Sequence, residues 1–256
     1  MAPDRDSPVA RDGSPYPDRA RPTFERDVRA MFASIADRYD AFNHLATFGL
    51  DLVWRPRALW ELDRYRRTPV RTALDVGCGT GGLARLLARH YPRADVVAVD
   101  FSRAMVAAAH RVRGTPAGLG VANASRLPFS DGTFDLAASA FVARNFADLP
   151  RTARELLRVL RPGGVLLTLE VSEPQAPSVA RLFHAHFDRV VPMIGRAFGR
   201  EGPYRYLPES LRRFPPVREV VAILGAAGFV RTVARPISLG IVTAYLAEAP
   251  PSDQRG

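Results

Sequence analysis

The sequence predicts an α/β fold: a doubly wound sheet, mostly parallel with an antiparallel edge strand, plus N-terminal helices and a helical insertion. Two observations favour this fold. From Arg71 onward, short apolar runs alternate with helical patterns, which is typical of βαβ units in a parallel sheet. In addition, a glycine-rich turn, "GCGTGG" at 77–82, joins the first apolar run to a helix, as in Rossmann-like domains.

Length and composition suit a single domain. The 256 residues include 47% hydrophobic ones, enough for a substantial core, which we expect over residues 23–250. Residues 1–22 are rich in Pro, Asp, Arg, Ser and Gly and are predicted to be a disordered tail. No apolar run approaches the ~18 residues that span a bilayer, and the first twenty residues lack the apolar stretch of a secretory signal. Cys78 is the single cysteine, which excludes an internal disulfide. We therefore expect a cytoplasmic protein.

The basic excess is carried by arginine alone. The net charge is +10 and the chain contains no lysine, a uniformity that indicates biased composition more than a designed binding surface. No dense basic run is interleaved with aromatic residues, so we expect no nucleic-acid partner. An anionic membrane surface stays open as a partner.

The first elements are predicted to be helices. An amphipathic helix starts near Phe24, since apolar residues recur at helical spacing at Val28, Met31, Phe32, Ile35 and Tyr39. A second helix is predicted for Asp51–Tyr65, with Pro56 near its first turn. We expect residues 23–68 to form a helical lid.

The alternating part and the end of the chain complete the prediction. Strands are expected at 72–76, 95–99, 120–122, 135–140 and 164–171, and helices at 82–90, 104–112 and 150–160. "RPGG" at 161–164 ends the last of these helices. Residues 177–215 break the rhythm and are interpreted as a helical insertion over the acceptor site. The end predicts one more helix and two strands that pair as a hairpin at the sheet edge.

The glycine turn indicates a nucleoside ligand. Gly77, Gly79 and Gly82 satisfy G-x-G-x-x-G, which by itself predicts no more than a tight strand-to-helix turn. Asp100 ends the second strand, where a carboxylate can accept hydrogen bonds from both ribose hydroxyls. The loop and the acid together favour an adenosine ligand, either NAD or S-adenosylmethionine (SAM).

Asp75 and Asn123 favour SAM. A carboxylate two residues before the first glycine would repel a pyrophosphate but would attract an ammonium and a sulfonium group. Asn123 follows the third strand and can accept a hydrogen bond from an adenine amino group. No metal site is expected, because His184 and His186 point to different sides of one helix.

Several motifs carry a family resemblance. "LDVGCGTG", "VAVDFSRAM", "LPFSDGTFDL" and "LRVLRPGG" resemble class I SAM-dependent methyltransferases. "MFASIADRYDAFNHLATFGLDLVWR", "ANASRLPF", "ARNFAD", "LEVSEP", "YRYLPES" and "GIVTAY" are more selective and resemble the menaquinone/ubiquinone biosynthesis C-methyltransferase family over residues 28–247. The resemblance implies an enzyme that uses SAM to methylate a ring carbon of a prenylated quinol, such as demethylmenaquinol.

The resemblance also implies the residues of the cofactor site. It places the methionine end of SAM at Asp75, Gly77, Gly79 and Thr80, and the ribose at Asp100. Met105 would pack on the adenine, and Asn123 with Ala124 would face its edge; Phe101 belongs to the same cofactor-binding set.

The expected catalytic residues are Arg144, Asn145 and Tyr39. Arg144 and Asn145 follow the fourth strand, at the edge where such sheets bind ligands. Arg144 could favour the phenolate and orient a water, Asn145 could bond the quinol oxygen, and Tyr39 could reach the same pocket. The structural alternatives are that Arg144 pairs with an acid such as Asp148 and that Tyr39 only packs in the lid. His186 is either a base or a surface residue.

Departures from the family pattern keep other functions open. The chain has "SAFVARN" where the family commonly has "SFGLRN", so Ala140 and Val142 make the acceptor side less polar or bulkier. The alternatives are a C- or O-methyltransferase of the same fold acting on another aromatic or polyketide-like small molecule in specialised metabolism, or a SAM-binding protein without catalysis. A lipid acceptor predicts peripheral membrane contact, with arginines around an apolar lid. The oligomeric state stays open, a homodimer included.

Overall fold

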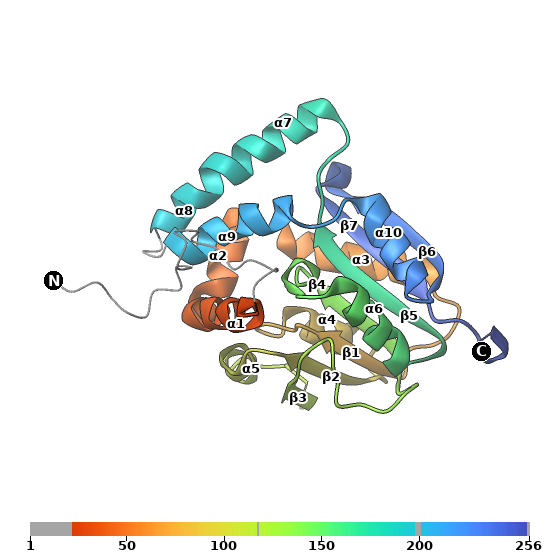
Figure 1. Cartoon of the computed structure of the whole chain (residues 1–256). Helices are drawn as coiled ribbons and strands as arrows, with labels where there is room; N and C mark the ends of the chain where they lie inside the picture. The colour runs from red at the N-terminus through yellow and green to blue at the C-terminus, as the bar shows by residue number, and fades with distance from the viewer. Residues whose placement is uncertain (1–21, 117, 198–200, 255–256) are drawn as a thin grey trace.

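The computed structural model describes residues 22–116, 118–197 and 201–254 (Figure 1). The tail predicted for residues 1–22 lies outside the described residues, except for Pro22. Within the described ranges the chain is built around one sheet, with helices on both of its faces and a group of helices beyond one end of the strands (Figure 1).

The sheet has seven strands in the order β3-β2-β1-β4-β5-β7-β6. The first five strands are parallel, whereas β7 runs antiparallel to both of its neighbours. The predicted edge hairpin is confirmed, with β6 as the edge strand and β7 as the inner one. The strands are β1 (Thr72–Val76), β2 (Asp95–Asp100), β3 (Gly118–Val121), β4 (Phe134–Ala140), β5 (Leu160–Val171), β6 (Val230–Ile237) and β7 (Val242–Glu248).

Helices cover both faces, which explains why the central strands are continuous apolar runs. One face packs against α3 (Asp51–Tyr65) and α4 (Gly82–His90), whose buried side chains include Leu59 and Leu87. The other face packs against α6 (Leu149–Val159) and α10 (Val217–Ala226). Helix α5 (Arg103–His110) contacts β2 and β3.

The N-terminal segment forms two helices where the spacing suggested a single one. Helix α1 (Phe24–Ile35) buries Phe24, Val28, Met31 and Ile35 on one stripe. A 3₁₀ turn over Ala36–Arg38 then separates it from α2 (Tyr39–Ala46). Tyr39 therefore begins a new helix and does not continue the stripe of α1.

The predicted insertion is helical. It comprises α7 (Pro177–Ala185), a π-helical turn (His186–Val190), α8 (Val191–Ala197) and α9 (Glu201–Arg212). Helix α8 packs on α2 and on α9, and α9 also contacts α1 and the 3₁₀ turn Ala143–Asn145 that follows β4. The insertion and the N-terminal helices together cover the carboxyl edge of the sheet (Figure 1).

The main difference from the predicted elements is at "RPGG". The helix ends at Val159 as expected, but β5 already begins at Leu160, which pairs with Phe134 before the register shifts at Val165. The expected turn is therefore a bulge within the strand. The 3₁₀ turns Ser238–Gly240, between β6 and β7, and Ser252–Gln254 complete the elements.

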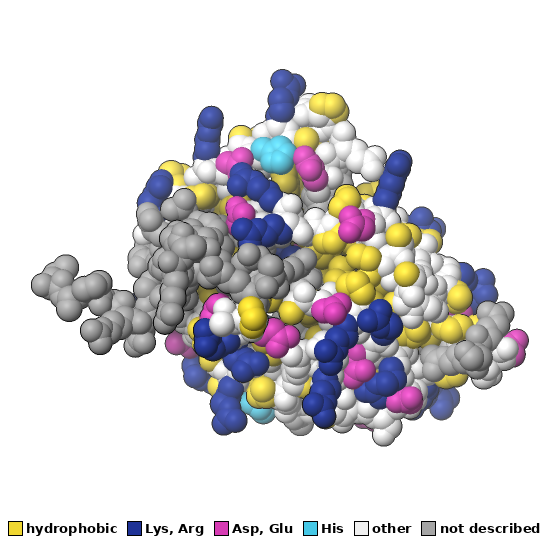
Figure 2. Space-filling view, viewed as in Figure 1, with side chains coloured by type: hydrophobic (Ala, Val, Ile, Leu, Met, Phe, Trp, Pro, Cys, Tyr) yellow, Lys and Arg dark blue, Asp and Glu magenta, His cyan; other side chains and the backbone are white. Residues whose placement is uncertain are grey.

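The surface shown in Figure 2 carries arginines all around its outline, many of them beside acidic side chains. A central apolar area lies among them (Figure 2). In the described parts of the chain, no helix combines the length and the apolarity that crossing a bilayer requires.

Candidate active site at the carboxyl edge of the sheet

Two buried carboxylates lie at the tips of neighbouring strands. Asp75 is on β1 and Asp100 ends β2, and the parallel register places both at the carboxyl edge, as the sequence predicts. Asp75 is 1% exposed, and neither of its oxygens has a hydrogen-bond partner among the described residues. An unbonded buried carboxylate is costly, so this position fits a cation supplied by a ligand.

The surroundings of Asp75 raise its pKa toward neutrality. Burial raises the pKa of Asp75 to about 7, and the nearby charge of Asp100 adds to this effect. The Arg55 guanidinium and, to a smaller extent, the Ala84 backbone N–H oppose both effects by favouring the ionised carboxylate. An ammonium group placed beside Asp75 would stabilise its ionised form in the same way.

The glycine loop passes close to the segment that follows β4. Gly77 has a φ of +70°, and a Cβ built on it would lie 2.4 Å from Cγ2 of Val142. Gly79 also has a positive φ, of +55°. The third glycine with this conformation is Gly81, before α4, whereas Gly82, the third glycine of the sequence motif, is helical. The loop thus keeps its backbone bare where a ligand would approach it.

Asp100 ties this loop to β2. Its Oδ2 accepts a 2.9 Å hydrogen bond from the Gly79 N–H, and its Oδ1 accepts a 2.8 Å bond from the Ser102 N–H. Burial raises the pKa of Asp100, and these two N–H groups work against that rise. Because each carboxylate oxygen can accept two hydrogen bonds, Asp100 retains capacity for two ribose hydroxyls.

A cavity of about 450 Å³, hereafter the nucleoside cavity, adjoins the loop. Three residues of the predicted cofactor set besides Gly77 line it: Phe101, Asn123 and Ala124. Met105 is buried but does not line the cavity; it packs with Ala36 and Ala108 in a separate cluster. The remaining lining residues are Glu25, Ala122, Ser125, Val142, Asn145, Phe146, Ala147 and Thr152.

Asn123 is held by two neighbours. Its Oδ1 accepts hydrogen bonds from the N–H and the hydroxyl of Ser125, both at 2.9 Å. Its Nδ2 donates to both carboxylate oxygens of Glu25 on α1, at 3.1 and 3.0 Å. The oxygen expected to face an adenine amino group is therefore bonded to Ser125. Glu25 is a cavity residue that the sequence did not suggest.

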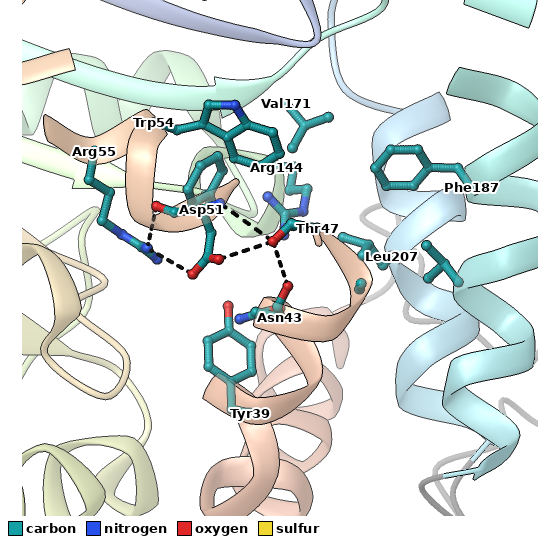
Figure 3. Close-up of a pocket in the computed structure, with 13 residues that line it drawn as sticks. Tyr39, Asn43, Thr47, Asp51, Trp54, Arg55, Arg144, Val171, Phe187 and Leu207 are labelled. Carbon is teal, nitrogen blue, oxygen red and sulfur yellow. Dashed lines mark hydrogen bonds and ion pairs between the residues drawn. The ribbon is translucent and has the colours of Figure 1, made fainter. Parts of the chain in front are cut away.

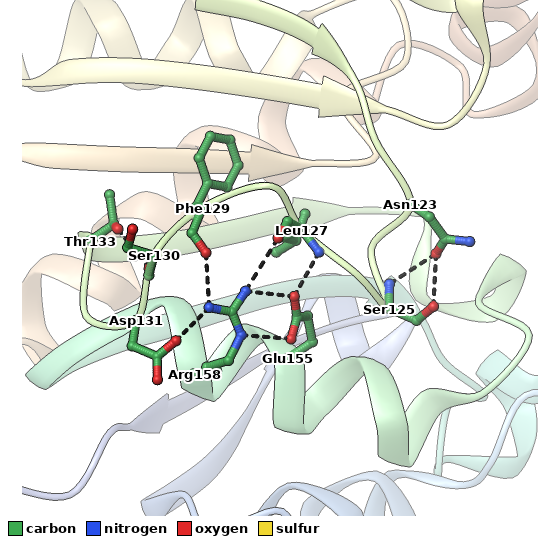
Figure 4. A network of polar contacts seen from close by, with 9 residues as sticks. All are labelled: Asn123, Ser125, Leu127, Phe129, Ser130, Asp131, Thr133, Glu155 and Arg158. Carbon is green, nitrogen blue, oxygen red and sulfur yellow. Dashed lines mark hydrogen bonds and ion pairs between the residues drawn. The ribbon is translucent and has the colours of Figure 1, made fainter.

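The loop that carries Asn123 is fixed from below by α6 (Figure 4). Glu155 accepts a 2.6 Å hydrogen bond from the Leu127 N–H, and Arg158 donates to the Phe129 carbonyl at 2.8 Å and pairs with Glu155 and Asp131. The hydrogen bond from Arg158 is the main cause of the lowered pKa of Glu155. This network stabilises the wall of the nucleoside cavity.

A second cavity, of about 510 Å³, lies between the N-terminal helices and the insertion (Figure 3). We refer to it as the acceptor cavity. Much of its wall is apolar, and its polar side chains come mainly from α2 and α3. It is lined by Tyr39, Asn43, Ala46, Thr47, Asp51, Trp54, Arg55, Phe141, Arg144, Val171, Phe187, Val191 and Leu207.

Arg144 lines the acceptor cavity and forms a buried ion pair. Its Nη1 donates to Oε1 of Glu170 at 2.5 Å, and its backbone N–H donates to Oε2 at 3.2 Å. Burial works to lower the pKa of Arg144, but Glu170, Tyr39 and Tyr206 outweigh it and raise that pKa. Asp148, the acid considered from the sequence, instead caps α6 through the Arg151 N–H.

Asn145 faces the other cavity. It lines the nucleoside cavity and accepts a 3.0 Å hydrogen bond from the Tyr206 hydroxyl on α9. Tyr39 lies in the acceptor cavity, and its ring is 4.0 Å from where a Cβ on Gly79 would be. Arg144 and Tyr39 are therefore brought together, whereas Asn145 is directed to the nucleoside side.

Thr80 connects the glycine loop to the lid. Its hydroxyl donates a 2.7 Å hydrogen bond to Oδ1 of Asp40 on α2. His186, considered as a base, lines neither cavity; its Nε2 lies 2.7 Å from the Ala46 carbonyl. His184 pairs with Glu173 at the surface.

Sequence reasoning missed Asp51 and Arg55. Both come from α3 and line the acceptor cavity, and Arg55 donates to the backbone and the side chain of Asp51 (Figure 3). Arg55 also lies 5.3 Å from the Phe141 ring, and its Nε is buried without a partner among the described residues. Their place inside the "DLVWR" motif was the only signal in the sequence.

Comparisons with known proteins show the family of this chain. The model of the ubiE/COQ5 methyltransferase family matches residues 21–248. The demethylmenaquinone methyltransferase of Thermus thermophilus is 43% identical over 203 residues, 78% of this chain and 91% of that protein. The ubiquinone/menaquinone biosynthesis C-methyltransferase UbiE of Geobacter sulfurreducens is 40% identical over 227 residues, 86% and 88% of the two chains.

Solved structures share the fold. A SAM-dependent methyltransferase of Thermotoga maritima has a TM-score of 0.61 at 17% identity, over 86% of this chain and 98% of that one. The [4+2]-cyclase SpnF has a TM-score of 0.55 at 23% identity, over 76% and 80%. At these identities the likeness concerns the fold alone.

Proposed function

Because the chain belongs to the ubiE/COQ5 methyltransferase family, we propose that it transfers the methyl group of SAM to a ring carbon of a prenylated quinol such as demethylmenaquinol. Its family and its fold make it a SAM-dependent methyltransferase. The observation that carries the proposal is that Tyr39 lies against the glycine loop and also lines a largely apolar cavity with Arg144.

The residues present fit SAM. The unbonded, buried Asp75 offers a partner for the ammonium group, and the bare backbone at Gly77 and Gly79 allows close approach of the methionine end near Thr80. Asp100 would hold the ribose hydroxyls. Phe101, Asn123 and Ala124 would surround the adenine in the nucleoside cavity, whereas Met105 packs with Ala36 and Ala108 outside that cavity.

SAM supplies an activated methyl group, so the chain's own residues need only align the acceptor and stabilise its charge. Arg144 is a fixed cation in the acceptor cavity, which favours a phenolate over a phenol. The Tyr39 hydroxyl points toward Asp51 and Asn43 (Figure 3) and can orient a quinol oxygen. Asn145 would contribute from the nucleoside side, next to Tyr206.

An exposed apolar surface lies beside the acceptor cavity. Phe48, between α2 and α3, is 72% exposed and packs beside His186, and Leu239, next to the Ser238 that bonds Trp54, is 78% exposed. Both adopt positive φ values, 52° and 59°, which are unfavourable for such side chains. This surface also includes the exposed apolar residues between α2 and the first turn of α3, and one on α7: Leu45, Leu50, Leu52, Val53 and Leu182. We propose that this surface, hereafter the apolar rim, contacts a membrane from which the acceptor enters.

The function is tested by incubating the purified protein with SAM and a reduced demethylated naphthoquinol, and then determining product mass and methyl position. We expect one methyl group on a ring carbon, and no product with the oxidised quinone, because only the quinol ring is electron-rich. Methylation of oxygen, or turnover restricted to unrelated aromatic molecules, would replace the proposed acceptor.

A further inference from the structure

We propose that Asp51 is the base that removes the ring proton when the acceptor carbon is methylated. The inference rests on the proposed function, since only C-methylation of a ring releases such a proton. Asp51 is the first residue of α3, is 4% exposed, and lines the acceptor cavity together with Tyr39 and Arg144.

The carboxylate of Asp51 is fixed by three donors. Its Oδ1 accepts a 3.0 Å hydrogen bond from the Thr47 hydroxyl. Its Oδ2 lies 2.7 Å from Nδ1 of His44 and 3.4 Å from Nη1 of Arg55. Two carboxylate oxygens offer about four acceptor positions, so one remains for a proton on the cavity side. The same contacts fix the orientation of the carboxylate toward the cavity.

The other ionisable groups of the acceptor cavity are unsuited to this role. Arg55 and Arg144 are cations with no free lone pair, and Tyr39 is a phenol, whose hydroxyl is itself a proton donor. Glu170 is engaged by Arg144 and does not line this cavity. Among the lining residues that the structure describes, Asp51 is the one carboxylate.

Asp51 also lies on the side of the cavity that faces the cofactor loop. Arg55, which bonds it, approaches within 3.8 Å of where a Cβ on Gly82 would be, and its charge reaches Asp75. Tyr39 spans the same interval, since it contacts the glycine loop and lines the cavity. A ring placed between Tyr39 and Arg144 would thus present its reacting edge to Asp51.

The step balances with the residues named. An electron pair of the ring carbon forms the new bond to the methyl group, and the bond from that group to sulfur breaks with its pair left on sulfur. The ring C–H bond then breaks, its pair restores the aromatic ring, and the proton moves to an Asp51 oxygen. Asp51 releases that proton to water after the product has left.

The test compares Asp51→Asn with the wild type on an acceptor carrying deuterium at the methylated carbon. Wild-type turnover should show almost no isotope effect, because proton loss is fast. In Asp51→Asn we expect kcat to fall by about 10²-fold or more, with a clear primary isotope effect, because proton removal becomes limiting. SAM binding, measured by calorimetry, should stay close to that of the wild type.

Asp63 provides the matched control. It lies at the other end of α3, outside both cavities, and also pairs with a histidine, His90, at 2.6 Å. Asp63→Asn should keep wild-type kcat and show no isotope effect. Asp51→Glu retains a carboxylate at a displaced position and should turn over faster than Asp51→Asn. It serves as the second test variant if Asp51→Asn has a folding defect.

The outcomes separate the two proposals. If the wild type is active and Asp51→Asn loses kcat without showing an isotope effect, the role of Asp51 in ring-proton removal is overturned. An unchanged kcat in Asp51→Asn would overturn it as well. A wild-type enzyme that methylates oxygen would overturn both the quinol function and this inference. A wild-type enzyme that methylates the ring carbon of another aromatic acceptor would remove only the proposed acceptor, and the isotope comparison is then made on that molecule.

Discussion

The Asp100 carboxylate accepts a 2.9 Å hydrogen bond from the N–H of Gly79, so the side chain that we propose for the ribose also closes the glycine loop. Replacing Asp100 by Ala removes the loop contact and both ribose acceptors. We expect SAM affinity to fall at least tenfold, a loss of about 1.4 kcal/mol or more. Isothermal titration calorimetry measures it. Asp100→Asn keeps one acceptor oxygen and should bind with intermediate affinity; equal affinities for all three proteins would show that the ribose lies elsewhere.

SAM binding should depend on pH through Asp75. Its pKa of about 7 in the free protein means that the group is mostly protonated below that pH, whereas an ammonium ligand requires the anion. Affinity should therefore fall as pH drops below about 7, by up to tenfold per pH unit. Calorimetry from about pH 5 to pH 8 tests this. Asp75→Asn should bind weakly with little pH dependence, and a flat wild-type profile would contradict the pairing.

The same carboxylate should lower folding stability at neutral pH. Because the folded pKa of Asp75 is raised, its contribution to stability is fully present below the unfolded value and is lost as pH rises through about 7. Asp75→Asn should therefore raise the free energy of unfolding above pH 7 by on the order of 4 kcal/mol, since each pKa unit corresponds to about 1.4 kcal/mol, while SAM affinity falls. Urea unfolding of both proteins at acid and alkaline pH measures the difference, which should vanish at low pH.

The buried pair of Arg144 and Glu170 should be sensitive to loss of one partner. Arg144→Ala leaves Glu170 buried without its cation, so the free energy of unfolding should fall by about 3–5 kcal/mol. The double variant Arg144→Met/Glu170→Gln should lose less than the sum of the two single changes. Urea unfolding measures these values. Arg111, in an exposed pair with Asp37, is the control, and Arg111→Ala should cost less than about 1 kcal/mol.

Arg144 should also affect catalysis apart from stability. In the folded double variant we expect turnover to fall strongly while SAM affinity stays close to that of the wild type, because Arg144 lines the acceptor cavity and not the nucleoside cavity. Full activity in a folded variant without Arg144 would show that the acceptor does not use this cation.

A side chain at Gly77 should destabilise the protein, because it would clash with Val142. Gly77→Ala places a Cβ 2.4 Å from Val142 and keeps a positive φ, so we expect a loss of about 2–4 kcal/mol in the free energy of unfolding. Adding Val142→Gly removes the contact and should restore the larger part of the lost free energy of unfolding. The remaining loss should come from the backbone strain at residue 77. Thermal unfolding of the single and double variants measures the coupling; strictly additive effects would exclude the proposed clash.

The apolar rim should govern membrane contact. Phe48→Glu combined with Leu239→Glu removes two of the three most exposed apolar side chains of that surface and should abolish co-sedimentation with anionic liposomes. Val112→Glu, which follows α5, is the control and should sediment like the wild type. Turnover of a short-chain, water-soluble quinol should be unaffected in both. Equal sedimentation of all three proteins would exclude the rim as the contact.

The elements of the sheet could be predicted because their patterns are local. Strand β1 and helices α3 and α4 have the predicted limits, and Asp75 and Asp100 lie where strand-end residues of a parallel sheet must lie. Tyr39 could be expected from the sequence, but the α3 side of the cavity could not be predicted, because tertiary packing alone decides which α3 side chains enter it. Asp51 shares a motif with exposed neighbours, and nothing local distinguishes it.

The division between Arg144 and Asn145 could not be predicted either. The two residues are adjacent in sequence, and the 3₁₀ turn after β4 directs them to different cavities. Glu25 was missed for a related reason, since its contact with Asn123 joins residues 98 positions apart.

The strand order has a consequence for how the chain acquires its structure. Strand β7 comes last in the sequence but lies between β5 and β6, with hydrogen bonds to both. During synthesis, therefore, β5 presents an unpaired edge until the ribosome has released β7. Strand β6 is made earlier, but it cannot join the sheet before β7 is present, because β7 is its one neighbour in the described sheet. A nascent chain halted before Val242 would expose that edge to other chains, so aggregation should begin with β5.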